Sequence, residues 1–367
     1  MRHTLLVSFT VLLFCSSDAS FAQETNTHSL GGEGGCGDEH TLAIPLPSSR
    51  LTTVPDEFMI FLCPDFLAAD KEVVLGAVKA AGGREFAEFP EVSAIAVKVK
   101  PGTGPHLMAA LARATRISQI IPNVVSSQMA TPFPQQVSLD SIFSQLIIAL
   151  NQGGRVLNMS LNIEPVRPMS KRELRQAKME WRKSLTPLVK RIRAKNTLLV
   201  LAAGNNGLDG DDNYLPKGAS SDDVRSWKEN VIIVGASDRQ DHIASFSDRG
   251  KTVDVYAPGE EIEIPKVASH GQIVAYIVQL VAPGAQLIGE KPPTTTTETV
   301  LGNGTSFAAP LVTGVLALAL SIDGLPSDIP ASHLKQLLVE TSNVTSDGVR
   351  IPDAKRLVDA VVKLKRK

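Results

Sequence analysis

The chain has 367 residues, in which 37 Lys and Arg residues nearly balance 38 Asp and Glu residues and give a formal net charge of −1. This balance excludes a protein that binds nucleic acid or another polyanion through bulk positive charge. Hydrophobic residues make up 43% and charged residues 20%, which indicates a globular protein and excludes a largely disordered chain. The length predicts two or three domains.

The N-terminal residues predict export. Arg2 precedes an apolar run from Leu5 to Phe14, which is too short to span a bilayer, and Ser20-Phe21-Ala22 offers small residues to a signal peptidase. We therefore expect a signal peptide over residues 1–22 and a secreted or periplasmic protein. No later segment reaches 18 consecutive apolar residues, so we expect no membrane span.

Cysteine is scarce for an exported protein. Cys15 lies in the expected signal peptide, which leaves Cys36 and Cys63. One bridge between them is possible but cannot be deduced from the sequence. The stability of the chain is expected to come from a hydrophobic core and not from a disulfide framework.

Two further segments precede the main domain. Residues 23–54 are polar and rich in Gly, which predicts a flexible tether. Residues 55–127 show the β-α-β-β-α-β order of a small α+β ferredoxin-like unit. Its patterns predict strands at Glu57–Leu62, Ser93–Val99 and Ile117–Val125 and helices at Ala68–Ala80 and Leu107–Ala114.

From about residue 138 the pattern changes to that of an α/β domain. Short apolar runs predict strands that are buried on both faces of a parallel sheet, at 155–161, 198–203, 231–234 and 253–257. Helical patterns alternate with them at 142–150 and 174–192, and the run 307–320 is apolar all round. Residues 128–367 are therefore expected to form a parallel sheet flanked by helices.

One segment departs from the neutral average. Residues 167–195 contain eleven Lys and Arg residues and two Glu residues, and their apolar residues recur at helical spacing. The pattern favours a helix with one face packed on the sheet and a basic face in solvent. Docking to an anionic surface is the alternative.

A glycine-rich loop provides the sharpest chemical signal. Gly302 and Gly304 permit a tight turn just before Ser306, which opens the apolar helical run. At a helix N-terminus, free backbone N–H groups and the helix dipole stabilise developing negative charge. Taken alone, Ser306 could equally be a helix cap.

Several segments, in order, resemble the subtilisin-like serine proteases (subtilases). Gly304-Thr305-Ser306-Phe307-Ala308-Ala309-Pro310 resembles the family's nucleophile motif. Segments 156–161, 199–207, 231–235 with 244–247, and 253–259 resemble its core strands and loops, in the family's order. Residues 55–127 are similar to its inhibitor-type prodomain, through 56–62, 82–83 and 121–125.

The resemblance implies a zymogen that acts on proteins or peptides. Ser306 would attack the peptide carbonyl, and the side-chain amide of Asn205 would donate to the oxyanion. From the residues alone, Asn205 could also be a turn former. The chain's own prodomain would be its partner as folding template and inhibitor, until it is cleaved near Val125–Gln128.

The sequence also departs from the family's pattern. No Asp-Ser/Thr-Gly motif occurs, and only residues 128–141 stand where the family places its Asp strand and His helix. Segment 269–275, with 281–288 after it, resembles the family's His helix and following strand but comes after Asn205. The resemblance implies that His270 is the base, although a lone His at a helix start is more often a cap or a surface residue. Ile273 replaces a second His and Tyr276 a Gly.

No acid can be assigned to the expected triad. None of the aspartates that could serve lies in a segment that resembles the family's Asp motif: Asp140, Asp209, Asp211, Asp212 and Asp254. Two hypotheses follow, an active secreted serine endopeptidase and a catalytically impaired homologue that binds or inhibits. We expect no cofactor. A structural calcium ion stays open, because loop 209–212 lacks an ordered ligand spacing.

Overall fold

The computed structural model describes residues 52–63, 66–111, 116–128, 135–163, 168–209, 214–266, 270–283, 287–288, 291–293, 298–322 and 329–364. The predicted signal peptide and nearly all of the predicted tether lie outside these residues. Cys63 is disulfide-bonded, while Cys15 and Cys36 lie outside the described part. Among the described residues, no helix is both long enough and apolar enough to cross a membrane.

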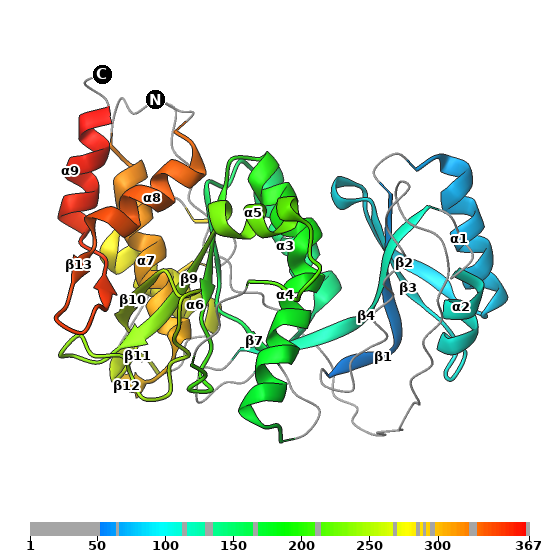
Figure 1. The fold of residues 1–367 in the computed structure, drawn as a ribbon, viewed down its shortest axis with the longest axis horizontal. Coiled ribbons are helices and arrows are strands. Elements are labelled where there is room, and N and C mark those ends of the chain that lie inside the picture. Colours follow the sequence, from blue (N-terminus) through cyan, green and yellow to red (C-terminus); the bar gives the residue numbers. More distant parts are fainter. Residues whose placement is uncertain are drawn as a thin grey trace.

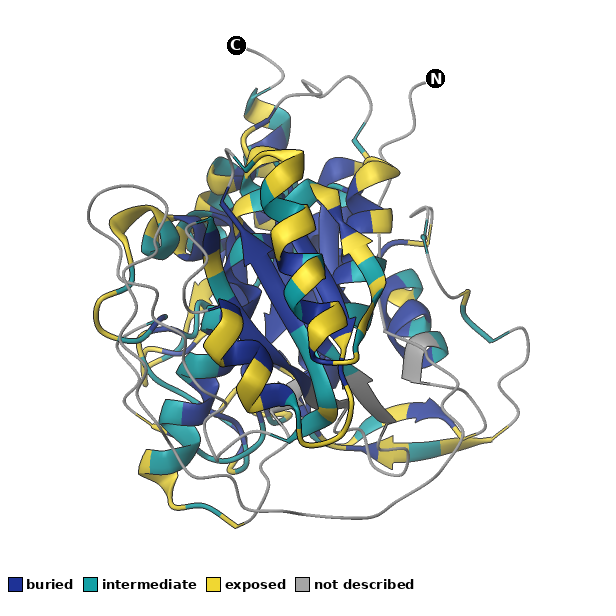
Figure 2. Ribbon diagram, turned by 90° about the vertical axis from the view of Figure 1, so that its right-hand side faces the viewer, coloured by how far each residue is buried: buried dark blue, intermediate teal, exposed yellow. Residues whose placement is uncertain are grey.

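The N-terminal unit has the predicted element order. Its strands are β1 (Thr53–Leu62), β2 (Arg84–Phe89), β3 (Ala94–Lys98) and β4 (Ile117–Gln128), and its helices are α1 (Ala68–Ala80), α2 (Gly104–Leu111) and the short η1 (Pro90–Val92). The antiparallel strands are ordered β2-β3-β1-β4. Figure 1 shows both long helices on one face of this sheet, and Figure 2 shows exposed residues on the outer helix faces over buried strands.

The two faces of this sheet serve different cores. Successive side chains of a strand point to opposite faces. Ile60 packs in a cluster with α1 and α2, whereas Phe61 packs in a second cluster with α3 (Leu139–Asn151). The Phe143 ring of α3 lies 5.7 Å from the Phe61 ring and 5.9 Å from the Phe89 ring. One hydrophobic core therefore joins the N-terminal unit to the rest of the molecule.

The β4 strand also crosses between the two parts. Its C-terminal residues pair antiparallel with β5 (Gln135–Ser138) and with β7 (Asn162–Ile163). The sheet of the N-terminal unit thus extends to six strands. The predicted boundary at residue 127 lies inside this strand.

The predicted parallel sheet is present, with the order β10-β9-β8-β6. Its strands are β6 (Val156–Met159), β8 (Leu198–Ala202), β9 (Val231–Ser237) and β10 (Val255–Pro258). The first three are buried at every residue, as their apolar runs predict. In the described part of the chain, β6 is an edge of this sheet.

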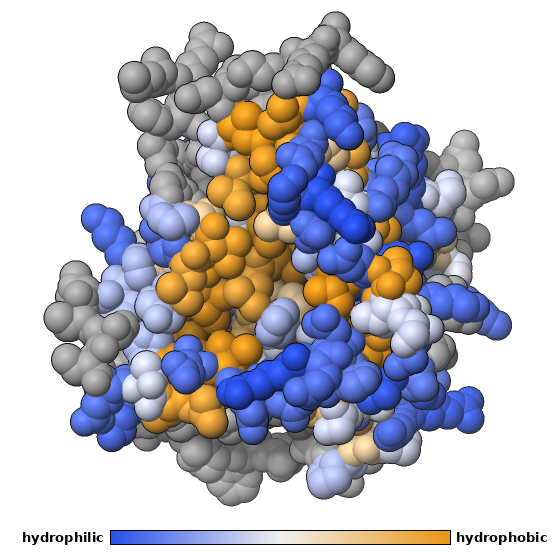
Figure 3. All heavy atoms as spheres, turned by 90° about the vertical axis from the view of Figure 1, so that its left-hand side faces the viewer, coloured by the Kyte–Doolittle hydropathy of each residue, from blue (hydrophilic) through white to orange (hydrophobic). Residues whose placement is uncertain are grey.

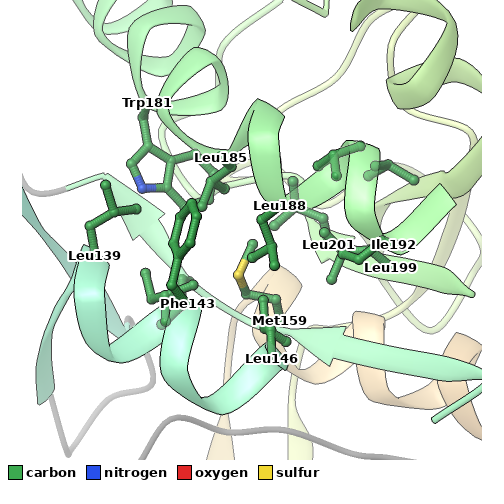
Figure 4. Close-up of a cluster of buried hydrophobic side chains, with 14 of the residues drawn as sticks. Leu139, Phe143, Leu146, Met159, Trp181, Leu185, Leu188, Ile192, Leu199 and Leu201 are labelled. Atoms are coloured by element: carbon green, nitrogen blue, oxygen red, sulfur yellow. The ribbon is translucent and has the colours of Figure 1, made fainter. Parts of the chain in front are cut away.

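Helices cover both faces of the parallel sheet. Leu199 and Leu201 of β8 face α3, α4 (Lys171–Ala194) and α5 (Ser221–Asn230), and Figure 4 shows this cluster around Phe143 and Trp181. Leu198 and Val200 face α6 (His270–Val281), α7 (Thr305–Leu320), α8 (Ala331–Thr341) and α9 (Ala354–Leu364). The α/β class and the flanking helices are therefore confirmed.

Short strands complete the C-terminal region. β11 (Ile262–Pro265) pairs with β12 (Thr299–Gly302), and β13 (Asn343–Val344) pairs with β14 (Arg350–Ile351). The strand expected within 281–288 is not formed in the described residues, because Val281 ends α6 and neither Leu287 nor Ile288 is in a strand. Figure 3 shows apolar side chains gathered on the face of the molecule that lies on the left in Figure 1. Leu280, Leu301 and Val344 are large apolar side chains of this region that are exposed.

The basic segment 167–195 contains α4, which packs on the sheet as expected. Lys178 and Arg182 are buried, and Lys190 and Arg193 form ion pairs with carboxylates of α5. Arg193 is the main reason that the pKa of Asp222 lies below its usual value. At least these four basic side chains are therefore engaged within the fold.

Candidate active site

Ser306 lies in the first turn of α7 and is buried, with 3% of its surface exposed. The preceding glycine loop is tightly packed, because a Cβ added to Gly302 would lie 2.8 Å from the Phe307 ring. The hydroxyl of Ser160, just after β6, donates a hydrogen bond to the backbone carbonyl of Ser306 over 3.2 Å. The nucleophile candidate is therefore held at the positive end of a rigid helix.

A buried polar chain supports the same helix. The Asn158 side chain of β6 donates to Ser160 Oγ over 3.0 Å and accepts a hydrogen bond from Thr313 Oγ1 over 3.1 Å. Thr313 lies two turns after Ser306 on α7. These bonds fix α7 against the end of the sheet.

Asn205 lies in the loop that follows β8, beside the start of α7. Its Oδ1 accepts hydrogen bonds from the Thr305 backbone N–H over 2.9 Å and from Thr305 Oγ1 over 2.8 Å. Because Oδ1 is held by Thr305, the amide NH₂ group points away from Thr305 and is oriented as a donor. The structure thus places Asn205 against Thr305, the residue that precedes Ser306.

Helix α6 begins at His270, and its packing places its first turns near the start of α7. Ile273 and Ile277 share a cluster with Phe307, and farther along a Cβ added to Gly314 would lie 2.7 Å from Val281. The two helices therefore run in the same direction, with their N-termini at the same end. The His270 side chain lies outside the described residues, so its role as a base stays a prediction.

The candidate acids are distributed over different contacts. Asp140 binds Asn123 of β4 over 2.8 Å, and Asp254 precedes β10 and binds Lys335 over 2.8 Å. Burial raises the pKa of the Asp254 carboxyl, and Lys335 opposes this rise. Asp209 is exposed, and Asp211 and Asp212 lie outside the described residues. These contacts do not identify any of the described carboxylates as the acid of a catalytic triad.

A polar cavity of about 460 Å³ borders Asn205. Its walls include Lys171, Asn206, Asp209, Ser245 and Phe246. Among the described residues, no group of three or more His, Cys, Asp or Glu side chains is arranged to hold a metal ion.

The end of β4 lies close to this site. Ser126 pairs with Ile163 and Ser127 with Asn162, which is two residues after the Ser160 that contacts Ser306. The segment predicted for cleavage is therefore an extended strand between β5 and β7. The contacts of Ser160 and Thr305 with this site were not predicted from the sequence.

A family profile shows to which protein family the chain belongs. The profile of the subtilase family matches residues 106–359, more than half of the chain. The chain belongs to the subtilase family. The match confirms the resemblance found in the sequence.

Similar proteins include named proteases. Alkaline protease 1 of Aspergillus clavatus is 30% identical over 154 residues, which cover 42% of this chain and 29% of that protein. A thermophilic serine proteinase of Bacillus sp. is 33% identical over 125 residues, which cover 34% of this chain and 25% of that protein. The chain therefore matches less than a third of the length of these relatives.

A solved structure supports the fold. Fervidolysin of Fervidobacterium pennivorans, a keratinolytic enzyme related to subtilisin, aligns with a TM-score of 0.57 over 92% of this chain and 65% of its own. The two sequences are 14% identical, so the likeness concerns the fold.

Proposed function

We propose that this subtilase is a serine endopeptidase that hydrolyses peptide bonds of proteins or peptides through an acyl-enzyme. The observation that carries the proposal is the Asn205 amide, which Thr305 orients beside Ser306 at the N-terminus of α7. Such an amide donates to the oxygen that becomes negative when a hydroxyl attacks a carbonyl.

The proposed reaction has two stages. Ser306 Oγ attacks the peptide carbonyl carbon while a base, for which His270 is the candidate, takes the hydroxyl proton. The resulting tetrahedral oxyanion accepts a hydrogen bond from Asn205, and the C–N bond breaks as the leaving amine takes that proton. Water then attacks the acyl-enzyme, which releases the acid and restores Ser306.

Secretion as a zymogen is part of this proposal. The N-terminal sequence supports export, and the disulfide of Cys63 suits an oxidising compartment. Protease substrates bind as extended strands. The pairing of Ser126 and Ser127 with β7 therefore supports a prodomain whose last strand binds like a substrate and is cleaved near Val125–Gln128.

Labelling of Ser306 with a fluorophosphonate tests the proposal. Purified chain should acquire the label at Ser306, hydrolyse a peptide and be cleaved near residues 125–128. The Ser306→Ala variant should remain folded and lose all three properties. Wild-type protein that is folded but neither labelled nor processed would contradict the peptidase assignment.

A second function is favoured by the short sheet. In the described residues, the parallel sheet ends at β6, and Asp140 and Asp254 are engaged away from Ser306. A homologue that has lost its acid would act as a binding or inhibitory protein with the prodomain retained. In that case Ser306→Ala should bind the same proteins as the wild type with equal affinity.

A further inference from the structure

A buried ion pair lies directly beneath the loop that carries Asn205. Lys178 Nζ of α4 lies 2.5 Å from Asp248 Oδ2, and the two side chains are only 10% and 4% exposed. Burial of two charges is unfavourable unless each also makes further hydrogen bonds. The partners of these additional hydrogen bonds show which segment of the chain the ion pair fixes.

Further hydrogen bonds of this pair go to the backbone of one loop. Asp248 Oδ1 accepts hydrogen bonds from the N–H groups of Asn206 and Leu208, both over 2.9 Å. The Asp248 N–H donates to the carbonyl of Gly204 over 2.9 Å, and the Lys178 ammonium donates to the carbonyl of Ala203. The pair thus binds the loop on both sides of Asn205.

The loop lies against the pair without intervening space. Gly204 has a φ of 113°, and a Cβ at this position would lie 2.6 Å from Asp248 Oδ2. On its other side, the Gly204 N–H donates to Thr305 Oγ1 over 3.1 Å. Asn205 is therefore held between the ion pair and the first residue of α7.

We propose that Lys178 and Asp248 form a positioning pair that holds the Asn205 amide where the oxyanion develops. The carboxylate orients two backbone N–H groups of the loop, and the lysine neutralises that carboxylate and fixes the carbonyl before Gly204. Neither side chain contacts the substrate; both act through Asn205. The catalytic part of this inference rests on the proposed peptidase function.

Apolar replacement of the pair tests the proposal. The double variant Lys178→Met with Asp248→Leu leaves no lone buried charge, and such replacements preserve folding in other proteins. We expect kcat for a peptide substrate to fall about 10- to 100-fold, with KM changed less than about twofold, because the oxyanion bond acts in the transition state. The variant Lys178→Met with Asp248→Asn keeps an oxygen acceptor and should recover most of this loss.

A second buried lysine pair among the described residues provides a control for loss of stability alone. Lys335 Nζ lies 2.8 Å from Asp254 Oδ1 and also donates to the carbonyl of Val231, away from the Asn205 loop. Lys335→Met should lower the melting temperature and leave kcat within about twofold of the wild type. An equal loss of kcat in this variant would overturn the positioning role.

A cycle with Asn205→Ala separates positioning from a general structural effect. If the pair acts through Asn205, its apolar replacement should lower kcat in the wild type and have almost no further effect in Asn205→Ala. Equal losses in both backgrounds would overturn the proposal.

Hydrogen exchange provides a measurement that does not depend on turnover. The backbone amides of Asn206 and Leu208 should exchange faster in the double variant Lys178→Met with Asp248→Leu. The comparison is with the wild type and with Lys335→Met. If the wild type does not hydrolyse peptides but these amides lose protection, the peptidase function fails and the structural part of the inference stands. Unchanged protection would overturn the pair's hold on the loop.

Discussion

At the scale of single residues, the candidate site depends on the orientation of one amide. Thr305 gives Asn205 Oδ1 two hydrogen bonds, one from its backbone and one from its hydroxyl. The same residue accepts a hydrogen bond from the Gly204 N–H. Thr305 therefore determines which end of the Asn205 side chain is available to a substrate.

This geometry predicts that Asn205→Asp is a more specific probe than a truncation. A carboxylate keeps the oxygen that Thr305 binds but has no N–H to donate, and its charge repels an oxyanion. We expect kcat to fall by about 10²- to 10³-fold with little change in KM. Steady-state kinetics and a melting curve of the same sample check this.

Asn205→Ala is the companion variant, because it loses both the donor and the anchor to Thr305. It should lose a similar amount of turnover and more thermal stability than Asn205→Asp. Full activity in Asn205→Asp would show that the amide does not stabilise the oxyanion.

The residues of the site differ in how far the sequence alone can predict them. Ser306 and Asn205 lie in recognisable local motifs, so both could be proposed as site residues from the sequence. The Lys178–Asp248 pair joins positions separated by 70 residues and is defined only when α4 packs on the sheet. No local pattern marks such a contact, and α4 offers many other lysines and arginines as candidates.

At the scale of elements, the contact between α6 and α7 determines where His270 lies. The helices approach closely at Gly314, where an added Cβ would lie 2.7 Å from Val281 Cβ and 3.2 Å from the carbonyl of Val278. Since both partners belong to α6, a larger side chain at this position must move that helix.

Gly314→Ala is therefore expected to separate α6 from α7. We expect a loss of about 1–3 kcal/mol in the free energy of unfolding, as is usual for overpacking, and lower labelling of Ser306 if His270 is the base. Gly76→Ala in α1 is the matched control, because no atom lies within 4 Å of the added Cβ. It should raise stability by about 0.5–1 kcal/mol. Denaturant titrations of both variants check the contrast, and equal effects would contradict the close contact.

Elements with a strong intrinsic pattern could be predicted, whereas those defined by pairing could not. The apolar runs at 198–203 and 231–234 gave strands because burial on both faces selects such sequences. By contrast, β5 and β7 exist through their pairing with β4, and β7 has only two residues. The packing of α6 beside the start of α7 could not be predicted either. It depends on contacts between side chains of the two helices, which no local sequence pattern marks.

At the scale of the whole molecule, the predicted prodomain and the predicted peptidase domain share one core. Met59, Phe61 and Phe89 of the N-terminal unit belong to the same cluster as Phe143 and Trp181. Polar contacts add to it, because Asn123 of β4 binds both Glu57 and Asp140. The parts are therefore expected to unfold together, although the sequence suggests separate domains.

Both tryptophans, Trp181 and Trp227, lie in the predicted peptidase domain, so their fluorescence reports on that part alone. Leu107 is fully buried in the separate cluster of α1 and α2. Leu107→Ala should cost about 2–5 kcal/mol. Because the cores are coupled, it should lower the denaturation midpoint seen by tryptophan fluorescence as much as the midpoint seen by far-UV circular dichroism.

Phe143→Ala tests the origin of this coupling, since its ring contacts both Phe61 and Phe89. Removing the ring should cost about 3–5 kcal/mol and weaken the joint between the two parts. In this background, Leu107→Ala should shift the circular dichroism midpoint but move the tryptophan midpoint much less. If Leu107→Ala leaves the denaturation midpoint measured by tryptophan fluorescence unchanged even in the wild-type background, the two parts fold independently. The shared cluster would then be only a contact between them.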